Sequence, residues 1–207
     1  MSDPTEQSKH PGHHWDARYR AHPWATEPDP ELVERASSLT PGTALDLGCG
    51  TGRHALWLAS RGWRVTGVDG STVGLEIAAE HARERGLSAE WVTADLTTWV
   101  ASHAYDLVVV ANIHLLPEER SSFFARVAAS VAPGGHLYVI GHHVDALGVA
   151  GPPDPRRLYT DETLARAFPH LTTLEHARLE RPAEGEGPAG VDVLLWATRP
   201  TNPETSR

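Results

Sequence analysis

The sequence predicts an α/β fold in which a mostly parallel sheet lies between helices. Short apolar stretches alternate with segments of helical period through residues 43–141. A glycine-rich turn follows the first apolar stretch and precedes a helix. Near the C-terminus, two strand-like stretches follow each other with no helix between them. Strand–helix alternation favours a parallel sheet, and the final pair predicts an antiparallel hairpin at one edge.

Each predicted strand is a short apolar or β-branched run between turn residues. The run at residues 106–111 is apolar nearly throughout, as expected for a strand that is covered on both faces. The predicted strands are Thr43–Leu47, Arg64–Val68, Glu90–Thr93, Asp106–Ala111, His136–Gly141, about Thr172–Leu179 and Gly190–Thr198.

Start and stop signals define the predicted helices. Gly62 and Gly86 each end a helix, whereas Pro117 begins one with two acids in its first turn, where they suit the helix dipole. Thr160 is an N-cap. The predicted helices are Glu31–Ser38, Arg53–Arg61, Ser71–Arg85, one from Pro117 that ends before Pro133, and one from Thr160 to about Phe168.

The length of 207 residues predicts one domain with an appended arm. Residues 1–14 are polar and are expected to form a disordered tail, and residues 15–40 a helical arm or lid. The main domain is expected to span residues 41–198, with a mobile connection at 182–188 and a flexible C-terminal tail at 199–207.

Composition excludes several classes of function. The 18 Lys and Arg residues are outnumbered by 27 Asp and Glu residues, and the net charge of −9 argues against a nucleic-acid partner and a polybasic membrane anchor. A single cysteine, Cys49, precludes an intramolecular disulfide and a cysteine-based zinc site. With no long apolar run and no secretory signal at its start, the chain is expected to be cytoplasmic.

No metal site is expected. His10, His13 and His14 form a cluster within the predicted tail, where a solvated stretch is expected. A site built from His114 and His142 lacks a carboxylate partner with ligand spacing.

The glycine-rich turn Asp46–Gly52 follows the first strand and opens a helix. Its glycines permit a sharp turn and close approach of a ligand to the backbone. A dinucleotide-binding pattern would need glycine at position 53, which is Arg53. A carboxylate at Asp46 would repel a pyrophosphate but suits a ligand that carries an ammonium or sulfonium group.

Two further acids end the second and third strands. Asp69 lies 21 positions after Gly48 and can accept hydrogen bonds from a ribose diol. Asp95 can accept from the exocyclic amine of an adenine, with the amide of Leu96 facing a ring nitrogen. Because the carboxyl ends of parallel strands share one edge of a sheet, we expect Asp46, Asp69 and Asp95 to converge on one crevice.

Residues 43–141 resemble the class I S-adenosylmethionine-dependent methyltransferases. Asp46–Gly52 matches their first motif, Asp69 their ribose-binding acid, Asp95 their adenine-site acid, and Pro133-Gly134-Gly135 the turn before the fifth strand. The resemblance implies a three-layer Rossmann-like sandwich with seven strands, and S-adenosyl-L-methionine as cofactor with S-adenosyl-L-homocysteine as product. The candidate cofactor-binding residues are Asp46, Gly48, Cys49, Gly50, Gly52, Asp69, Gly70, Ser71, Asp95, Leu96 and Asn112.

A narrower resemblance covers most of residues 15–198. The segments that carry it begin at Trp15, Tyr105, His114, Gly141 and Gly151. They are similar to small bacterial methyltransferases of the tellurite-resistance or thiopurine-methyltransferase-like type, which are associated with soft nucleophiles such as thiols, chalcogen oxyanions and halides. The leading prediction is methyl transfer to such a small molecule, by a monomer or homodimer.

The expected acceptor site lies at the ends of the fourth and fifth strands. His114 and His142 are the candidate catalytic residues, and His114 would serve as a base for an amine or hydroxyl acceptor. A soft anion needs no base. Aromatic side chains of the arm are expected to form a lid. The candidate substrate-binding residues are Trp15, Tyr19, Trp24, His114, His142 and Tyr159.

Three alternatives remain open. One is an N- or O-methyltransferase of a specialised metabolite that uses a histidine base. Another is a module that binds S-adenosylmethionine without turnover. A third, a nicotinamide-dependent reductase, would be stabilised against heat by NAD(P).

Overall fold

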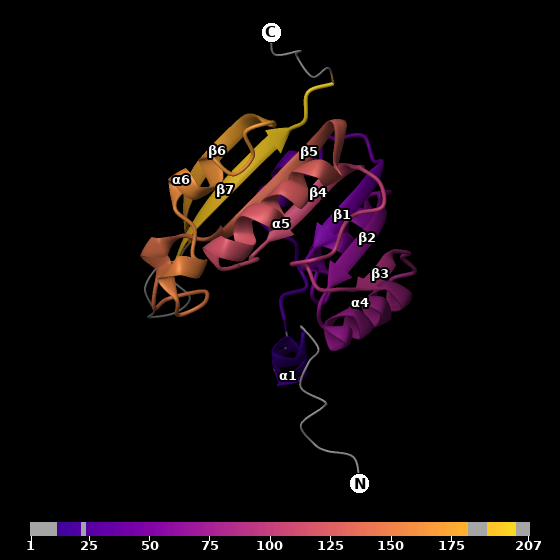
Figure 1. The fold of residues 1–207 in the computed structure, drawn as a ribbon. Coiled ribbons are helices and arrows are strands. Elements are labelled where there is room, and N and C mark those ends of the chain that lie inside the picture. The colour runs from indigo at the N-terminus through magenta and orange to yellow at the C-terminus, as the bar shows by residue number, and fades with distance from the viewer. Residues whose placement is uncertain (1–11, 22–23, 182–189, 202–207) are drawn as a thin grey trace. The chain divides into compact units, whose positions relative to one another are not determined.

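The computed structural model describes residues 12–21, 24–181 and 190–201 (Figure 1). It divides into two compact units, residues 1–99 and 100–207. The predicted N-terminal tail lies outside the described residues up to position 11, but a helix already begins at His13. The predicted mobile connection at 182–188 and residues 202–207 of the predicted C-terminal tail also lie outside the described part.

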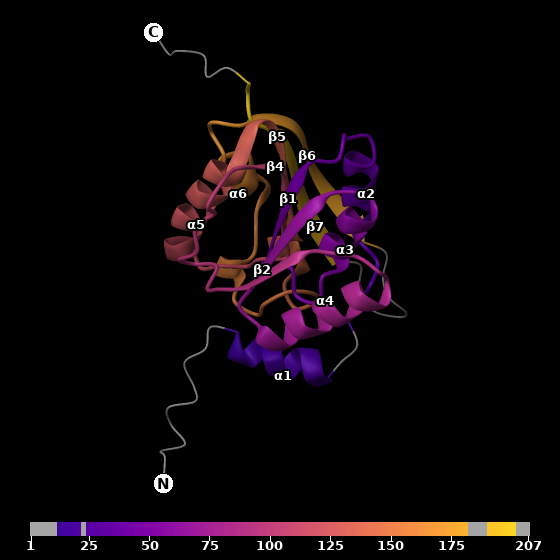
Figure 2. The same ribbon diagram turned by 90° about the vertical axis from the view of Figure 1, so that its right-hand side faces the viewer.

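In the first unit, three parallel strands alternate with helices. The strand order is β3-β2-β1, and both pairings are parallel, as predicted. Figure 2 shows α1 lying beside α4. The elements are α1 (His13–Ala21), α2 (Pro30–Ala36), β1 (Thr43–Leu47), α3 (Arg53–Ser60), β2 (Arg64–Asp69), α4 (Thr72–Glu84) and β3 (Glu90–Thr93).

In the second unit, a parallel pair of strands continues into an antiparallel pair. Strand order is β4-β5-β7-β6, with β4 and β5 parallel and β7 antiparallel to both of its neighbours. The predicted antiparallel hairpin is confirmed. The elements are β4 (Tyr105–Ala111), α5 (Pro117–Ser130), β5 (Val131–His142), the 3-10 turns η2 (Val144–Ala146) and η3 (Pro155–Arg157), α6 (Asp161–Ala165), β6 (Thr172–Arg181) and β7 (Gly190–Thr198).

The core of each unit is made by its central strands. In β4, residues 107–110 are fully buried, which confirms a strand that is covered on both faces. Leu45 of β1 and Leu56 of α3 are buried in the first unit. Among the described residues, no helix has both the length and the apolar character needed to cross a membrane.

The start of β5 differs from the prediction. The strand begins at Val131, so Pro133-Gly134-Gly135 lies inside it. Gly134 adopts φ +78° and donates its N–H to the carbonyl of Arg199, and the register against β4 shifts between Tyr105 and Leu107. The turn residues therefore form an irregularity within the strand instead of preceding it. The helix after Thr160 ends at Ala165, earlier than predicted.

Candidate functional site

The glycine-rich turn of the first unit has the strand–turn–helix geometry that its sequence predicts. Gly48, Gly50 and Gly52 have φ values of 73°, 52° and 84°, a region that residues with a Cβ rarely adopt. The N–H groups of Gly48 and Cys49 donate to the carbonyl of Val68 at the end of β2. The turn is therefore anchored to β2.

Asp69 joins this turn to the start of α4. Its Oδ2 accepts the N–H of Gly50 at 2.8 Å, and its Oδ1 accepts the N–H of Ser71 at 2.7 Å. Burial is the main cause that raises the pKa of Asp69, and these two hydrogen bonds oppose it. Each carboxylate oxygen has a second lone pair, so Asp69 retains the capacity to accept hydrogen bonds from ribose hydroxyls.

Asp46 lies beneath the turn, where it is 1% exposed. Its Oδ2 accepts the N–H of Ala55 in the first turn of α3, at 3.1 Å. Its Oδ1 is buried and has no hydrogen-bond partner within the described part of the chain. Burial raises the pKa of Asp46 to about 6, while the neighbouring His54 opposes that rise. The predicted contact with a cationic ligand stays a prediction.

Asp95 forms a local turn after β3. Its Oδ1 accepts hydrogen bonds from the N–H and the hydroxyl of Thr97, at 2.8 and 2.7 Å. β3 pairs with β2 so that Thr93 faces Asp69, and the N–H of Ala94 donates to the carbonyl of Asp69. The ends of β2 and β3 are thus joined, and they bring Asp69, Asp95 and Leu96 to one edge of this unit.

The aromatic arm lies against the same turn. A Cβ added to Gly50 would lie 2.4 Å from Oη of Tyr19, so Tyr19 covers the turn closely. The ring centroid of Tyr19 is 5.0 Å from that of Trp24 and 6.1 Å from that of Trp15. The structure brings these three candidate substrate-binding residues together beside the candidate cofactor loop. Their contact with a substrate stays a prediction.

Hydrogen bonds to Asp16 hold α1 at the start of α4. Oγ of Ser71 donates to Oδ1 of Asp16 at 2.5 Å, and the N–H of Val73 approaches the same oxygen at 3.3 Å. Gly70 lies at this junction, because a Cβ added to Gly12 would be 2.0 Å from the carbonyl oxygen of Gly70. Cys49 is buried beneath, and burial raises the pKa of its thiol, which favours packing over reactivity.

In the second unit, the structure brings the two candidate catalytic histidines together. His114 follows β4 and His142 ends β5, and their rings stack with centroids 5.1 Å apart. The backbone N–H of His142 donates to Nε2 of His114 at 3.4 Å, and Nδ1 of His114 lies 3.3 Å from the carbonyl of Arg157. Burial and then His142 lower the pKa of His114 to about 4.

His142 also contacts an acid that the sequence analysis did not single out. Its Nδ1 lies 2.9 Å from Oδ1 of Asp192 on β7, and Nε of Arg181 on β6 donates to the other oxygen at 2.8 Å. Asp192 is the one acid within the otherwise apolar or neutral strand at residues 190–198. That isolated charge was the signal in the sequence that could have identified Asp192 as a candidate site residue. Cross-strand pairing to His142 required the antiparallel register.

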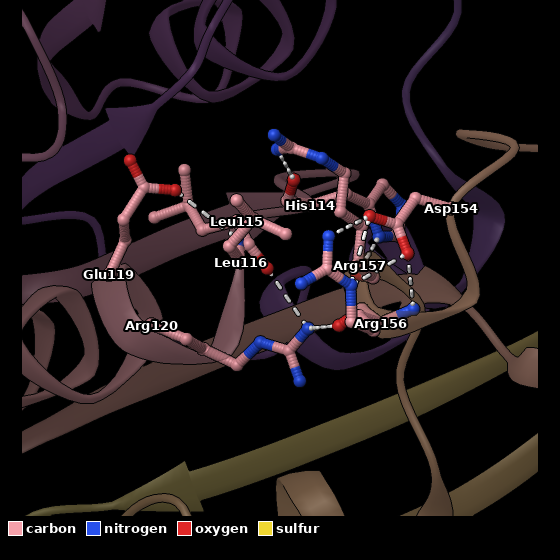
Figure 3. Close-up of polar contacts among 8 residues, drawn as sticks. All are labelled: His114, Leu115, Leu116, Glu119, Arg120, Asp154, Arg156 and Arg157. Carbon is pink, nitrogen blue, oxygen red and sulfur yellow. Dashed lines mark hydrogen bonds and ion pairs between the residues drawn. The ribbon is translucent and has the colours of Figure 1, made fainter.

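Tyr159 and two arginines fix the loop that surrounds the histidines. Tyr159 is buried, and its hydroxyl donates to the carbonyl of Ile113. In Figure 3, Arg120 donates to the carbonyls of Leu115 and Arg156, at 3.0 and 2.7 Å, and Arg157 donates to that of His114 at 3.1 Å. Residues 154–158 are thereby fastened to residues 113–120.

Asn112 is the residue other than glycine that has positive φ in the described part of the chain, at +57°. Its N–H donates to the carbonyl of Ile140 at 2.9 Å. Left-handed backbone at asparagine occurs at functional strand ends and at ordinary turns, so the predicted cofactor contact of Asn112 stays a prediction.

The chain is similar to known methyltransferases in sequence. Residues 44–135 match the family described as "Methyltransferase domain". Curated relatives include the ubiquinone biosynthesis O-methyltransferases of Cronobacter sakazakii, 36% identical over 110 residues, and Vibrio parahaemolyticus, 33% identical over 109 residues. Each match covers 52% of this chain, and the chain spans only 45% and 46% of those relatives.

Solved structures resemble the chain over most of its length. One was reported for the conversion of a disulfide bond into a thioacetal group during echinomycin biosynthesis, with TM-score 0.73 and 23% identity over 92% of this chain and 93% of that one. TehB from Haemophilus influenzae has TM-score 0.72 and 19% identity over 91% and 67%. The N-methyltransferase NodS from Bradyrhizobium japonicum, in complex with S-adenosyl-L-homocysteine, has TM-score 0.68 and 21% identity over 90% and 97%.

These likenesses define the class of fold: the α/β methyltransferase fold, with a mostly parallel seven-stranded sheet that ends in an antiparallel hairpin. The predicted fold class is confirmed. Residues 44–135 match a methyltransferase domain, in agreement with the predicted class of S-adenosylmethionine-dependent methyltransferase.

Proposed function

We propose that this protein is an S-adenosylmethionine-dependent methyltransferase that acts on a small molecule in the cytoplasm. The observation that carries the proposal is the side chain of Asp69, which is bonded to both the glycine-rich turn and the start of α4 within a methyltransferase domain. This arrangement holds a carboxylate in one orientation beside a turn that has no side chain at Gly50.

The residues present fit this cofactor. Asp69 would accept from the ribose, and Asp95 and Leu96 would contact the adenine. Gly48, Gly50, Gly52, Gly70 and Ser71 would offer backbone groups, with Cys49 packed beneath the turn. The buried, unpartnered Oδ1 of Asp46 gives the region under the turn the charge that a cationic methionyl group requires. When bound, S-adenosylmethionine supplies an electrophilic methyl carbon on a sulfonium and leaves as a neutral thioether.

Calorimetric titration of S-adenosylmethionine tests this assignment. Asp69→Ala is expected to weaken binding by on the order of 5- to 150-fold, because a buried ligand would lose charge-assisted hydrogen bonds. Glu80→Ala is a matched control on α4, since Glu80 pairs with Arg83 on an exposed surface. Equal affinity of the wild type and Asp69→Ala would refute the ribose role.

For the acceptor, two observations favour different classes. The motifs of the tellurite-resistance-type subgroup and the structural likeness to TehB support a soft nucleophile. The contact between His142 and Asp192 favours an acceptor that must lose a proton, which agrees with curated relatives named as O-methyltransferases. The proposed substrate-binding residues are Trp15, Tyr19 and Trp24 in the first unit and His114, His142 and Tyr159 in the second.

An acceptor screen separates these possibilities. The assay measures S-adenosyl-L-homocysteine released with thiols, selenite, tellurite, iodide, imidazoles, amines and phenols. Release with any acceptor supports an enzyme. Binding of S-adenosylmethionine with no release across the whole panel would instead support a non-catalytic binding module.

A further inference from the structure

His142 and Asp192 form a cross-strand pair at the end of the sheet of the second unit. They are direct register partners on β5 and β7, and Nδ1 of His142 lies 2.9 Å from Oδ1 of Asp192. Arg181 on β6 bonds to the second oxygen at 2.8 Å. Burial alone would raise the pKa of Asp192. The hydrogen bonds from His142 and Arg181 outweigh burial and hold this pKa below its usual range. Asp192 is therefore a carboxylate at neutral pH.

A carboxylate accepts hydrogen bonds and donates none, so Nδ1 of His142 carries the proton of this contact. In the neutral imidazole the other nitrogen, Nε2, then holds a lone pair. Within the described residues, Nε2 of His142 makes no hydrogen bond, and the side chain is 24% exposed. In its neutral form, His142 thus has the orientation and the tautomer of a general base.

His114 does not have these properties. Its Nε2 accepts the N–H of His142, and its Nδ1 faces the carbonyl of Arg157. Both ring nitrogens are therefore occupied by backbone groups. His114 stacks on His142 and limits the ring's movement. Among the described residues, the charged or titratable groups that contact His142 are His114 on one side and Asp192, backed by Arg181, on the other.

We propose that Asp192 is a positioning residue that holds His142 as the general base, and that the methyl acceptor is a small molecule bearing a hydroxyl, thiol or amine proton. This inference rests on the proposed function and selects one acceptor class within it. The acceptor transfers its proton to Nε2 of His142 as its lone pair forms the bond to the methyl carbon. The electron pair of the broken carbon–sulfur bond stays on sulfur. The imidazolium then releases the proton to water.

Nitrogen NMR of the histidine rings tests the positioning role in the free protein. In its neutral form, His142 of the wild type is expected to show the Nδ1–H tautomer, identified by the resonances lost in His142→Gln. Asp192→Asn should reduce this preference, because a neutral amide accepts the Nδ1 proton more weakly than a carboxylate. Asp192→Glu keeps the carboxylate and should restore the preference. Equal tautomer populations in the wild type and Asp192→Asn would overturn the inference.

Asp145→Asn is the matched control for these variants. Asp145 pairs with His143, the neighbouring histidine, at 3.5 Å and is half exposed. Its amide variant should leave the tautomer of His142 unchanged. Thermal unfolding of all variants establishes that each is folded before the spectra are compared.

Turnover supplies the second test. With a phenol or thiol acceptor, His142→Gln should lower kcat by roughly 10²- to 10⁴-fold. Asp192→Asn should lower kcat by less, Asp192→Glu should restore it, and Asp145→Asn should match the wild type. An unchanged kcat in Asp192→Asn, or turnover with iodide and tellurite but with no proton-bearing acceptor, would overturn the inference. Failure of the proposed function is seen separately, as absence of S-adenosylmethionine binding in calorimetry.

Discussion

Gly50 shows how a single residue shapes the candidate cofactor site. Its φ of +52° and the approach of Tyr19 to 2.4 Å from an added Cβ both select against a side chain. Gly50→Ala is expected to lower the free energy of unfolding by about 1–2 kcal/mol through backbone strain, and to weaken S-adenosylmethionine binding. Chemical denaturation and calorimetry measure the two effects.

Gly86 is the control for this substitution. Its φ is +64°, and an added Cβ would meet no atom within 4 Å. Gly86→Ala should carry a similar strain and leave ligand affinity unchanged. If Gly50→Ala binds as tightly as Gly86→Ala, close approach of the ligand to the turn is refuted.

His114 couples stability to pH. Its pKa in the folded protein is about 4, below the ordinary value of 6.5, so its contribution is fully present above pH 6.5. That contribution is lost as pH falls from 6.5 to 4, because the unfolded chain binds the proton more readily. It amounts to at most about 3 kcal/mol. We expect the difference in free energy of unfolding between wild type and His114→Gln to shrink across this window.

The difference in free energy of unfolding between the wild type and His114→Gln removes the pH dependence of other groups, some of which oppose that of His114. The pKa of Asp46 is raised to about 6, so its effect has the other sign: stability falls as pH rises from 4 to 6. Asp46 is present in both proteins and cancels. A difference that is constant from pH 4 to 7 would contradict the lowered pKa of His114.

At the scale of elements, the half-buried acid Asp16 holds α1 in position. Asp16 accepts hydrogen bonds from the hydroxyl of Ser71 and the N–H of Val73 at the start of α4. Asp16→Ala should lower stability by about 1 kcal/mol and speed hydrogen exchange at residues 13–21. Arg20→Ala, on an exposed position of the same helix, is the control. Unchanged exchange in Asp16→Ala would show that the aromatic contacts alone hold α1.

The sequence predicted most elements because the local signals were strong. The glycine-rich turn, the apolar run of β4 and the proline at the start of α5 each determine local structure through backbone geometry or burial. The beginning of β5 could not be predicted in this way. Pro133-Gly134-Gly135 reads locally as a turn, but pairing with β4 on either side of it, at Val131 and His136, and hydrogen bonds with Arg199 keep it in the strand.

At the scale of the whole molecule, ligand binding should appear as thermal stabilisation. A ligand at one hundred times its Kd adds about 2.7 kcal/mol, which for a chain of this size raises Tm by roughly 5–10 °C. Thermal unfolding with S-adenosylmethionine is expected to show this shift. NAD and NADP should give none, and stabilisation by them instead would favour the reductase alternative.

The sequence by itself determined the class of fold, the glycine-rich turn and the acids at or near the ends of β1, β2 and β3. These features depend on residues close together in the chain, where backbone conformation and alternation of strands and helices are encoded locally. Only the tertiary structure decided how the histidines differ. His142 meets Asp192 across fifty residues because β5 and β7 pair in one antiparallel register. Burial keeps His114 neutral, and the carbonyl of Arg157 occupies its Nδ1. Contacts of this kind arise from strand pairing and loop packing, which no local pattern specifies.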